Sequence, residues 1–158
     1  MSVIPLSKEL EILDLYFALQ KLRYEDKLEY TINVPSDINT GKTCIPSMLI
    51  QPYIENAIEH GIPFSKQSGM ISVLITRQNN SLICTVEDDG IGIKQSLKDK
   101  DETSSDYPSK GMQLTRERLR IINESISQKI DVEIADLSDL NPQAHGTRVT
   151  IHIPYKPL

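Results

Sequence analysis

Two short segments contain residues whose types and spacing could bind a small ligand. The first, VEDDGIGI, places Asp88, Gly90 and Gly92 directly after a run of β-branched residues. Glycines at this spacing let the backbone turn sharply and let a flat ligand approach closely, while the carboxylate can accept a hydrogen bond from an exocyclic amine. A strand that ends in an ordinary Asp-Gly turn has the same local pattern, so both interpretations stay open for this segment alone.

The second segment, QPYIENAIEHG, is predicted to be a short helix with one polar face. At about 100° per residue its apolar residues face one way, while Asn56, Glu59 and His60 face nearly the opposite way. An Asn carbonyl oxygen is a hard ligand that suits Mg²⁺, an ion that keeps several waters and completes its shell with phosphate oxygens. A solvated helix face would look the same, so this segment is also ambiguous by itself.

Three helices are predicted to position these segments. The first runs from Ser7 to about Tyr24, with Ser7 as its N-cap. Pro52 can open the second, because its missing N–H would be unpaired in the first turn anyway, and Gly61 lies where a left-handed C-terminal cap is expected. The third covers QLTRERLRIINESIS, whose apolar residues at helical spacing are Leu114, Leu119, Ile122 and Ile126.

The first helix carries two apolar stripes. One is formed by Leu10, Leu13 and Phe17. The other spreads over Ile12, Leu15, Tyr16, Leu19 and Leu22. A helix that packs on one side needs only one stripe. Either this helix is deeply buried, or its second side packs against a further segment or a partner.

Five segments have the pattern of β-strands. Residues 28–34 alternate between apolar and polar side chains, as a half-buried strand does. Residues 70–77 and 82–88 flank a short polar turn and are predicted to form an antiparallel hairpin. Two further strands are predicted at 130–135 and 147–153. Three helices with about five strands indicate an α/β two-layer sandwich.

A long polar segment separates the second half of the hairpin from the third helix. It runs from Lys94 to Lys110, and its only large apolar side chains are Leu97 and Tyr107. Such a segment can bury little surface and is predicted to be a mobile loop. A loop of this length in a compact domain usually has a function.

Composition excludes several classes of protein. The 158 residues fit one domain, and 17 basic against 22 acidic residues give a net charge of −5, which argues against nucleic-acid binding. No apolar run approaches the roughly 20 residues that span a bilayer, and the N-terminus lacks the pattern of a signal peptide. The two cysteines, Cys44 and Cys84, support neither a zinc site nor a disulfide framework, so a cytoplasmic location fits best.

Taken in order, these segments resemble the ATP-binding domain shared by DNA gyrase, the ninety-kilodalton heat-shock chaperones, sensor histidine kinases and MutL proteins. Within that superfamily, PSMLIQPYIENAIEHG and RERL resemble the LytS/YehU-type sensor histidine kinases. The likeness covers residues from about 8 to 155. It implies one domain over residues 1–158 with a Bergerat-type fold, in which a mixed, mainly antiparallel sheet of about five strands carries about three helices on one face.

The resemblance also implies roles for single residues. Asn56 matches the Mg²⁺-binding Asn of the family, and Asp88 matches the carboxylate that receives the adenine amino group. Thr147 and the preceding glycine in HGTRVTIHIP match a Gly-Thr pair whose hydroxyl reaches the adenine through water. The residues that the resemblance places at the nucleotide are Asn56, His60, Asp88, Gly90, Gly92, Lys110, Gly111, Met112, Arg116 and Thr147. His60 is equally well explained as a hydrogen-bonded structural residue.

By the same resemblance, residues 94–110 correspond to the ATP lid. Gly111 matches the second glycine of the family's G-x-G-L motif, while Ser109 stands where the first glycine is expected. Kinases often carry Lys three residues after the Mg²⁺-binding Asn, but this chain has Glu59 there. Positive charge for the phosphates must therefore come from Lys110, Arg116 or Arg118, and Arg116 has the better motif position.

A further departure concerns hydrolysis. Pro52 lies four residues before Asn56, where the gyrase and chaperone branches carry the glutamate that activates water. Glu55 is a poor substitute, because it lies about 100° around the helix from Asn56. The resemblance therefore implies Mg-ATP or ADP binding with very slow ATP hydrolysis.

The function implied is that of the catalytic domain of a two-component sensor histidine kinase. It would donate the γ-phosphoryl of ATP to a histidine on a separate dimerisation and phosphoacceptor domain, and the full-length kinase would pass it to a response regulator. No histidine precedes His60 in this chain, and the apolar first helix would fit a chain that begins just after that domain. The parent protein is expected to be a membrane sensor, with no membrane contact by this domain.

Two other functions share the fold. One is a non-catalytic interaction module, in which ATP orders the lid to create a protein-binding face. The other is a serine kinase of the anti-sigma-factor type, against which the Q-P-x-x-E-N string argues.

Overall fold

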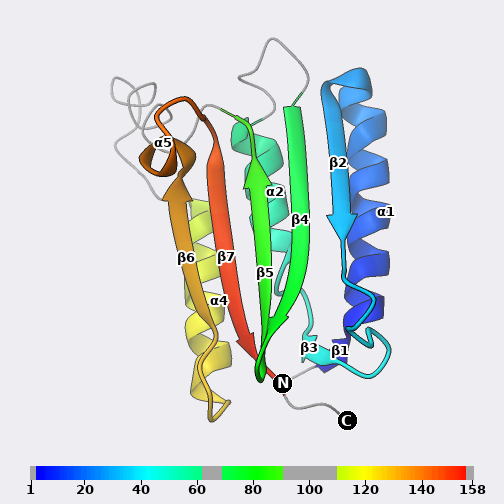
Figure 1. The fold of residues 1–158 in the computed structure, drawn as a ribbon, viewed down its shortest axis with the longest axis vertical. Coiled ribbons are helices and arrows are strands. Elements are labelled where there is room, and N and C mark those ends of the chain that lie inside the picture. The colour runs from blue at the N-terminus through cyan, green and yellow to red at the C-terminus, as the bar shows by residue number, and fades with distance from the viewer. Residues whose placement is uncertain (1–2, 62–68, 91–109, 156–158) are drawn as a thin grey trace.

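The computed structural model describes residues 3–61, 69–90 and 110–155, without the side chains of residues 26, 60, 61, 110 and 111. Within this part, five strands form one sheet in the order β2-β4-β5-β7-β6. Three long helices lie side by side behind one face of the sheet (Figure 1). The predicted two-layer α/β sandwich is therefore confirmed.

The sheet is mixed and mainly antiparallel, as expected. Strand β2 (Leu28–Asn33) is parallel to β4 (Gly69–Gln78), and all other neighbours are antiparallel. Strand β5 (Ser81–Asp88) lies at the centre, followed by β7 (Thr147–Pro154) and the edge strand β6 (Asp131–Asp136). In β4, Ile71, Val73 and Ile75 alternate into the core, which gives the sheet its buried face.

The predicted hairpin is present with a two-residue turn. Gln78 pairs with Ser81, which leaves Asn79 and Asn80 between the strands. Asn79 has a φ of 52°, a left-handed conformation that asparagine tolerates and that suits the twist of a tight hairpin.

The three long helices are α1 (Leu6–Tyr24), α2 (Gln51–Gly61) and α4 (Lys110–Glu124). A short helix α5 (Leu137–Leu140) follows β6, and a 3₁₀ turn (Glu25–Lys27) follows α1. Strands β1 (Val3–Pro5) and β3 (Cys44–Pro46) form a small second sheet near the start of α1 (Figure 1). None of the described helices is both long enough and apolar enough to cross a membrane.

The prediction of Ser7 as the N-cap of α1 is wrong. The helix begins at Leu6 after Pro5, and no side chain within the described residues caps it. Instead, the Leu6 N–H donates to the Thr43 carbonyl at 2.6 Å, and the Ser7 N–H donates to the Thr40 carbonyl at 2.9 Å. A distant loop therefore satisfies the first-turn N–H groups, a solution that local sequence does not reveal.

The deep burial considered for α1 is also wrong. Leu13 and Phe17 are fully buried, whereas Leu15, Leu19 and Leu22 of the second stripe are 61%, 64% and 78% exposed. The helix packs on the sheet mainly with one face, and these three leucines lie on its outer side, whereas Tyr16 of the same stripe is partly buried against the core.

Helix α4 starts before the predicted segment and ends at Glu124, so Ile126 lies beyond it. Ile122 is buried and Leu119 is partly buried against the core. Leu114, which was expected on the apolar face, is 72% exposed. The core contact at this end of the helix comes instead from Met112.

Candidate functional site

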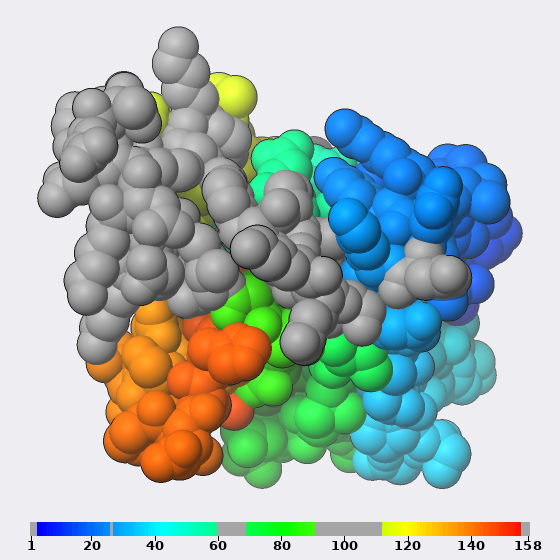
Figure 2. Space-filling model, turned by 90° about the horizontal axis from the view of Figure 1, so that it is seen from above, coloured from blue at the N-terminus to red at the C-terminus, as the bar shows by residue number. Residues whose placement is uncertain are grey.

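Several of the predicted site residues lie at one end of the sheet. The carboxyl end of β5, the start of β7, the end of α2 and the start of α4 all lie there (Figure 1). Figure 2 looks onto this end, with β5 and β7 between α5 on one side and α2 on the other. The fold therefore gathers segments that are far apart in the sequence at the place where a ligand was expected.

Asp88 is the last residue of β5 and is only 9% exposed. In the sheet it pairs with Ile71 of β4 on one side and with Thr147 of β7 on the other. Its Oδ1 accepts a hydrogen bond from the Gly90 N–H at 2.9 Å. The backbone N–H of Thr147 also faces the carboxylate. The carboxylate is thus fixed by the first turn after β5 and by the start of β7.

Burial raises the pKa of Asp88 from 3.8 to about 6. The Gly90 and Thr147 N–H groups oppose this rise, while the charges of Asp89 and Asp136 add to it. Desolvation is the largest of these effects, so the ionised form is costly in the absence of a ligand. A partner that donates a hydrogen bond to the carboxylate would offset this cost.

Gly146 leaves no room for a side chain next to Asp88. Its φ is 122°, and a Cβ atom at this position would lie 1.9 Å from the Asp88 carbonyl oxygen. Only glycine permits the chain to enter β7 so close to the end of β5. This requirement supports the sequence match of the Gly146-Thr147 pair on physical grounds.

Sequence analysis missed three residues that support this end of the sheet. His145 Nδ1 lies 3.0 Å from the Gly90 carbonyl oxygen, and Asp89 Oδ1 accepts from the Met70 N–H at 2.8 Å. Asp136 is buried and caps α5, accepting from the Ser138 N–H at 2.9 Å. The Asp136-Leu-Ser138 spacing is typical of a cap and could have been recognised, whereas the His145 contact joins distant segments.

Asn56 lies in the middle of α2 and is partly buried. As predicted, the apolar face of α2 packs into the core through Ile54, Ala57 and Ile58, while Glu59 is exposed. No group of three or more His, Cys, Asp or Glu side chains among the described residues could hold a metal ion. A single Asn oxygen nevertheless fits Mg²⁺ that keeps its waters and binds phosphate oxygens.

The cationic candidates on α4 separate into two kinds. Arg116 is exposed and close enough to the buried Tyr53 of α2 to lower the pKa of its hydroxyl, against the raising effect of burial. Arg118 instead donates to the backbone carbonyls of Ser47 and Met48, so its guanidinium is already committed. Of the two, Arg116 is the one available to a phosphate.

The structure describes the remaining predicted site residues only in part. Met112 is buried at the start of α4. Lys110 and Gly111 belong to the first turn of the same helix, and His60 belongs to α2, but their side chains are outside the described residues. Gly92, Ser109 and the predicted lid up to residue 109 also lie outside them.

Among the described residues, Glu55 is poorly suited to act as a base for water at Asn56. Its Oε1 accepts from Gln51 Nε2 at 3.0 Å. Together with Glu59 it adds to the effect of burial in raising the pKa of Tyr16 on α1 to about 12, so both carboxylates lie toward α1. This arrangement agrees with the expected separation of Glu55 from Asn56.

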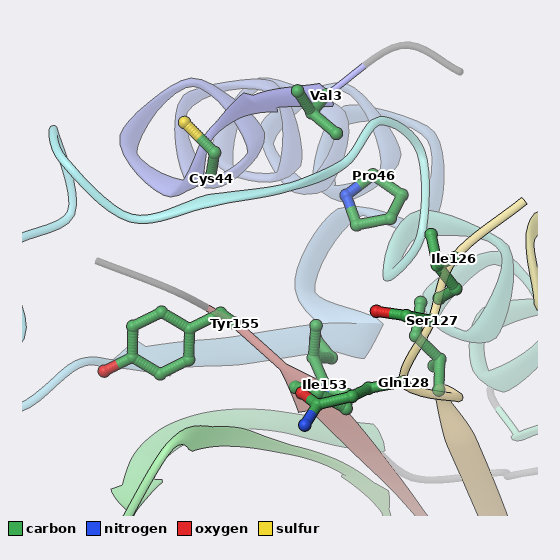
Figure 3. Close-up of a pocket in the computed structure, with 10 residues that line it drawn as sticks. Val3, Cys44, Pro46, Ile126, Ser127, Gln128, Ile153 and Tyr155 are labelled. Carbon is green, nitrogen blue, oxygen red and sulfur yellow. The ribbon is translucent and has the colours of Figure 1, made fainter. Parts of the chain in front are cut away.

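A separate cavity of about 380 Å³ lies at the opposite end of the molecule. Val3 and Pro46 line one side of it, and Gln128, Ile153 and Tyr155 line the other (Figure 3). The described residues around it are apolar or uncharged. Because it lacks charged groups and lies far from Asp88, it does not compete as the site for a phosphate ligand.

The fold and the site together define an ATP-binding domain of the two-layer α/β type, with a buried acceptor carboxylate at one end. A family model described as histidine kinase-, DNA gyrase B-, and HSP90-like ATPase matches residues 46–157. The chain belongs to this family. Its similarity to known proteins points to the histidine kinase branch and confirms the resemblance inferred from the sequence.

Several of the curated relatives are named as sensor histidine kinases or sensor proteins. The chain is 35% identical to the sensor histidine kinase YpdA of Escherichia coli K12 over 101 residues, 64% of this chain and 17% of the relative. It is 25% identical to BtsS of the same organism over 97% of this chain and 24% of the relative. It is 30% identical to LytS of Staphylococcus saprophyticus over 98% of this chain and 25% of the relative. The chain thus spans a quarter or less of the length of these relatives.

Solved structures share the fold at low sequence identity. The catalytic domain of histidine kinase ThkA has a TM-score of 0.64 at 12% identity, with 97% of this chain and 94% of that chain covered. The mycobacterial sensor histidine kinase MprB gives 0.62 at 15% identity, with 99% of both chains covered. Full-length ShkA in complex with AMPPNP gives 0.66 at 16% identity, covering 100% of this chain and 32% of that chain.

Proposed function

We propose that this chain binds Mg-ATP at the Asp88 end of the sheet and presents the γ-phosphoryl group to a histidine of a separate dimerisation and phosphoacceptor domain. It would serve as the catalytic domain of a LytS/YehU-type sensor histidine kinase, with residues 1–158 forming one domain. The observation that carries this proposal is the buried Asp88 carboxylate, held beside Gly146 where an adenine amino group can donate to it.

Each site residue has a stated role in this proposal. Asp88 accepts the adenine amino group, and Gly90, Gly92 and Thr147 border the base. Asn56 supplies one oxygen to Mg²⁺, which neutralises charge on the phosphates. Because the phosphoryl-transfer transition state needs little covalent help, positioning and charge neutralisation supply most of the catalysis. Residues assigned to the phosphate end are His60, Lys110, Gly111, Met112 and Arg116.

The wider context is part of the proposal. Because the chain spans a quarter or less of its curated relatives, the phosphoacceptor histidine, the response regulator and any membrane-bound sensing segment would belong to other parts of a parent protein. This domain would then lie in the cytoplasm. The AMPPNP complex of ShkA, which shares the fold, supports an adenine nucleotide as the ligand.

Calorimetric titration with ADP and Mg-ATP tests the nucleotide site. The parent chain should bind both, and Asp88→Asn should weaken binding at least tenfold, because its amide cannot act as the charged acceptor. Asp131→Asn is a matched control, since Asp131 is exposed at the far end of β6 and should leave affinity unchanged. Absence of binding by the parent chain, or equal binding by Asp88→Asn, would refute the proposal.

Phosphoryl transfer is tested by mixing the chain with candidate phosphoacceptor domains and radiolabelled ATP. The expected product is an acid-labile phosphohistidine on the acceptor domain. Acid-stable phosphoserine would indicate a serine kinase instead. Nucleotide binding without transfer to any acceptor would favour an interaction module.

A further inference from the structure

The turn that leads into α2 holds a strained residue. Met48 has a φ of 60°, in the left-handed region that side chains other than glycine rarely adopt. Such a conformation persists only where the surrounding structure imposes it. The turn leads directly into α2, the helix that carries Asn56.

A buried carboxylate holds one side of this turn. Glu9 of α1 is fully buried, and its Oε2 accepts from the Met48 N–H at 3.2 Å. The backbone N–H groups of Ile50 and Gln51 and the charge of Arg118 are near enough to affect its pKa, but Glu9 Oε1 has no hydrogen-bond partner among the described residues. These groups lower the pKa of Glu9, although burial raises it more. The acidic side chain thus lies at the N-terminal end of α2, where backbone N–H groups favour negative charge.

A guanidinium group holds the other side. Arg118 Nη1 donates to the Met48 carbonyl at 2.8 Å, and Arg118 Nη2 donates to the Ser47 carbonyl at 2.5 Å. The N–H and C=O of Met48 are therefore held by an acidic and a basic side chain from two different helices, α1 and α4. Two carbonyls held by one planar guanidinium group fix the direction of the peptide, which a single point charge would not do.

We propose that Glu9 and Arg118 are positioning residues for the nucleotide site, which hold the strained turn at Met48 and so place Asn56 of α2 relative to α4. This inference rests on the proposed function. Its consequence is that the Mg²⁺-dependent part of ATP affinity depends on Arg118 although Arg118 does not contact the nucleotide. Arg118 lies eight residues after Lys110, which is about 12 Å along the helix axis at 1.5 Å per residue. Its guanidinium N–H groups already donate to the Ser47 and Met48 carbonyls.

The test compares nucleotide affinity with and without Mg²⁺ in the full chain. Arg118→Met should weaken Mg-ATP binding about three- to tenfold and leave metal-free ATP binding within twofold of the parent. Arg120→Met is the matched control, because Arg120 lies on the same helix, is exposed and pairs with Glu117 and Glu124 of that helix. It should change neither affinity.

Two results would overturn the inference. Equal loss of Mg-ATP and metal-free ATP affinity would indicate a direct phosphate contact by Arg118. A lower melting temperature with unchanged affinities would indicate a purely structural role. If Arg118→Met does not fold, Arg118→Lys keeps the charge without the two-carbonyl geometry and should give the same selective loss. If the parent chain binds no nucleotide, the proposed function itself is refuted. Failure of the proposed function and failure of the inference about Arg118 therefore give different results.

Relief of the strain provides an independent test. Met48→Gly adopts the same φ at little cost, so in the Arg118→Met background it should restore most of the lost Mg-ATP affinity. Met48→Ala shortens the side chain without freeing φ and should not restore it. Absence of rescue by Met48→Gly, or equal rescue by Met48→Ala, would contradict a role for the turn.

Discussion

Asp88 illustrates at the residue scale how a binding group can oppose the stability of its own fold. The carboxylate is nearly buried and accepts a hydrogen bond from the Gly90 N–H, yet desolvation dominates and raises its pKa to about 6. Without a ligand, burial therefore makes the ionised carboxylate less stable here than in the unfolded chain, although it remains the main form at neutral pH. A ligand group that donates a hydrogen bond to the carboxylate would replace hydration that burial removes. We therefore expect the energetic cost of the ionised Asp88 side chain to fall on binding.

Asp88→Asn should stabilise the nucleotide-free protein at pH 7 while it weakens nucleotide binding at least tenfold. A rise of the pKa from 3.8 to about 6 corresponds to about 3 kcal/mol against the charged form, and we expect the variant to recover roughly 1–3 kcal/mol of it. Because the folded state binds the proton more tightly than the unfolded state, Asp88 lowers stability as the pH rises from about 4 to 6. Urea unfolding should show the difference between variant and parent growing over that range and then levelling off. A variant that is less stable than the parent at pH 7 would contradict this account.

Gly146→Ala should be severe, because the new Cβ would lie 1.9 Å from the Asp88 carbonyl oxygen and the φ of 122° disfavours any side chain. We expect a loss of about 2–4 kcal/mol in the free energy of unfolding, together with weaker nucleotide binding. Gly41→Ala is the control. Its nearest contact would be Asn39 Oδ1 at an ordinary 3.6 Å, so chemical denaturation should show little change.

Sequence patterns identified the central residues of this site but not their supports. Asp88 was found because the glycines that follow it have a spacing that lets a flat ligand approach the carboxylate closely, whereas Gly146 was found through the family resemblance. The contact of His145 with the Gly90 carbonyl leaves no such pattern, because it joins residues that are distant in the chain. The same holds for Arg118, which was one of three cations considered for the phosphates and which donates to backbone carbonyls instead.

At the scale of elements, periodicity predicted the helices and strands well and their ends poorly. The hairpin and the buried face of β4 follow directly from the period-2 pattern, because every second side chain must enter the core. Helix ends depend on which groups satisfy the terminal N–H and C=O groups, and these come from elsewhere in the fold. The start of α1 at Leu6, satisfied by the loop carbonyls of Thr40 and Thr43, is the clearest case.

Asn123 provides a test of such a long-range link. Its side chain donates to the Ile130 carbonyl at 3.0 Å and accepts from the Ile130 N–H at 2.8 Å, so it ties the end of α4 to the start of β6. Asn123→Ala leaves both backbone groups without this partner and should cost about 1–2 kcal/mol in the free energy of unfolding. Ser7→Ala is the comparison, because Ser7 does not cap α1 and should change stability by less than about 0.5 kcal/mol. Similar effects of the two changes in thermal or chemical unfolding would contradict these roles.

At the scale of the whole molecule, the site has few charges of its own for a phosphate ligand. The chain has a net charge of −5, and of the two arginines considered on α4 one is bound to backbone carbonyls. Polyanion binding here would rely on a metal ion, backbone N–H groups and one or two cations rather than on a basic surface. Such an arrangement can hold ATP for transfer to another domain without a group that activates water.

ATP hydrolysis by the chain alone should therefore be very slow. Pro52 stands four residues before Asn56, on the same side of α2, and Glu55 is bonded to Gln51 and directed toward α1. Pro52→Glu would place a carboxylate on the Asn56 side of the helix, near an N-terminus that favours negative charge. We expect it to raise hydrolysis about tenfold, below the roughly 10²- to 10⁴-fold contribution of a well-positioned general base, because the surrounding geometry is not arranged to hold the attacking water. Glu55→Gln should leave the slow basal rate unchanged in a phosphate-release assay. Fast hydrolysis by the parent chain, or a loss of it in Glu55→Gln, would show that a base for water already exists in this fold.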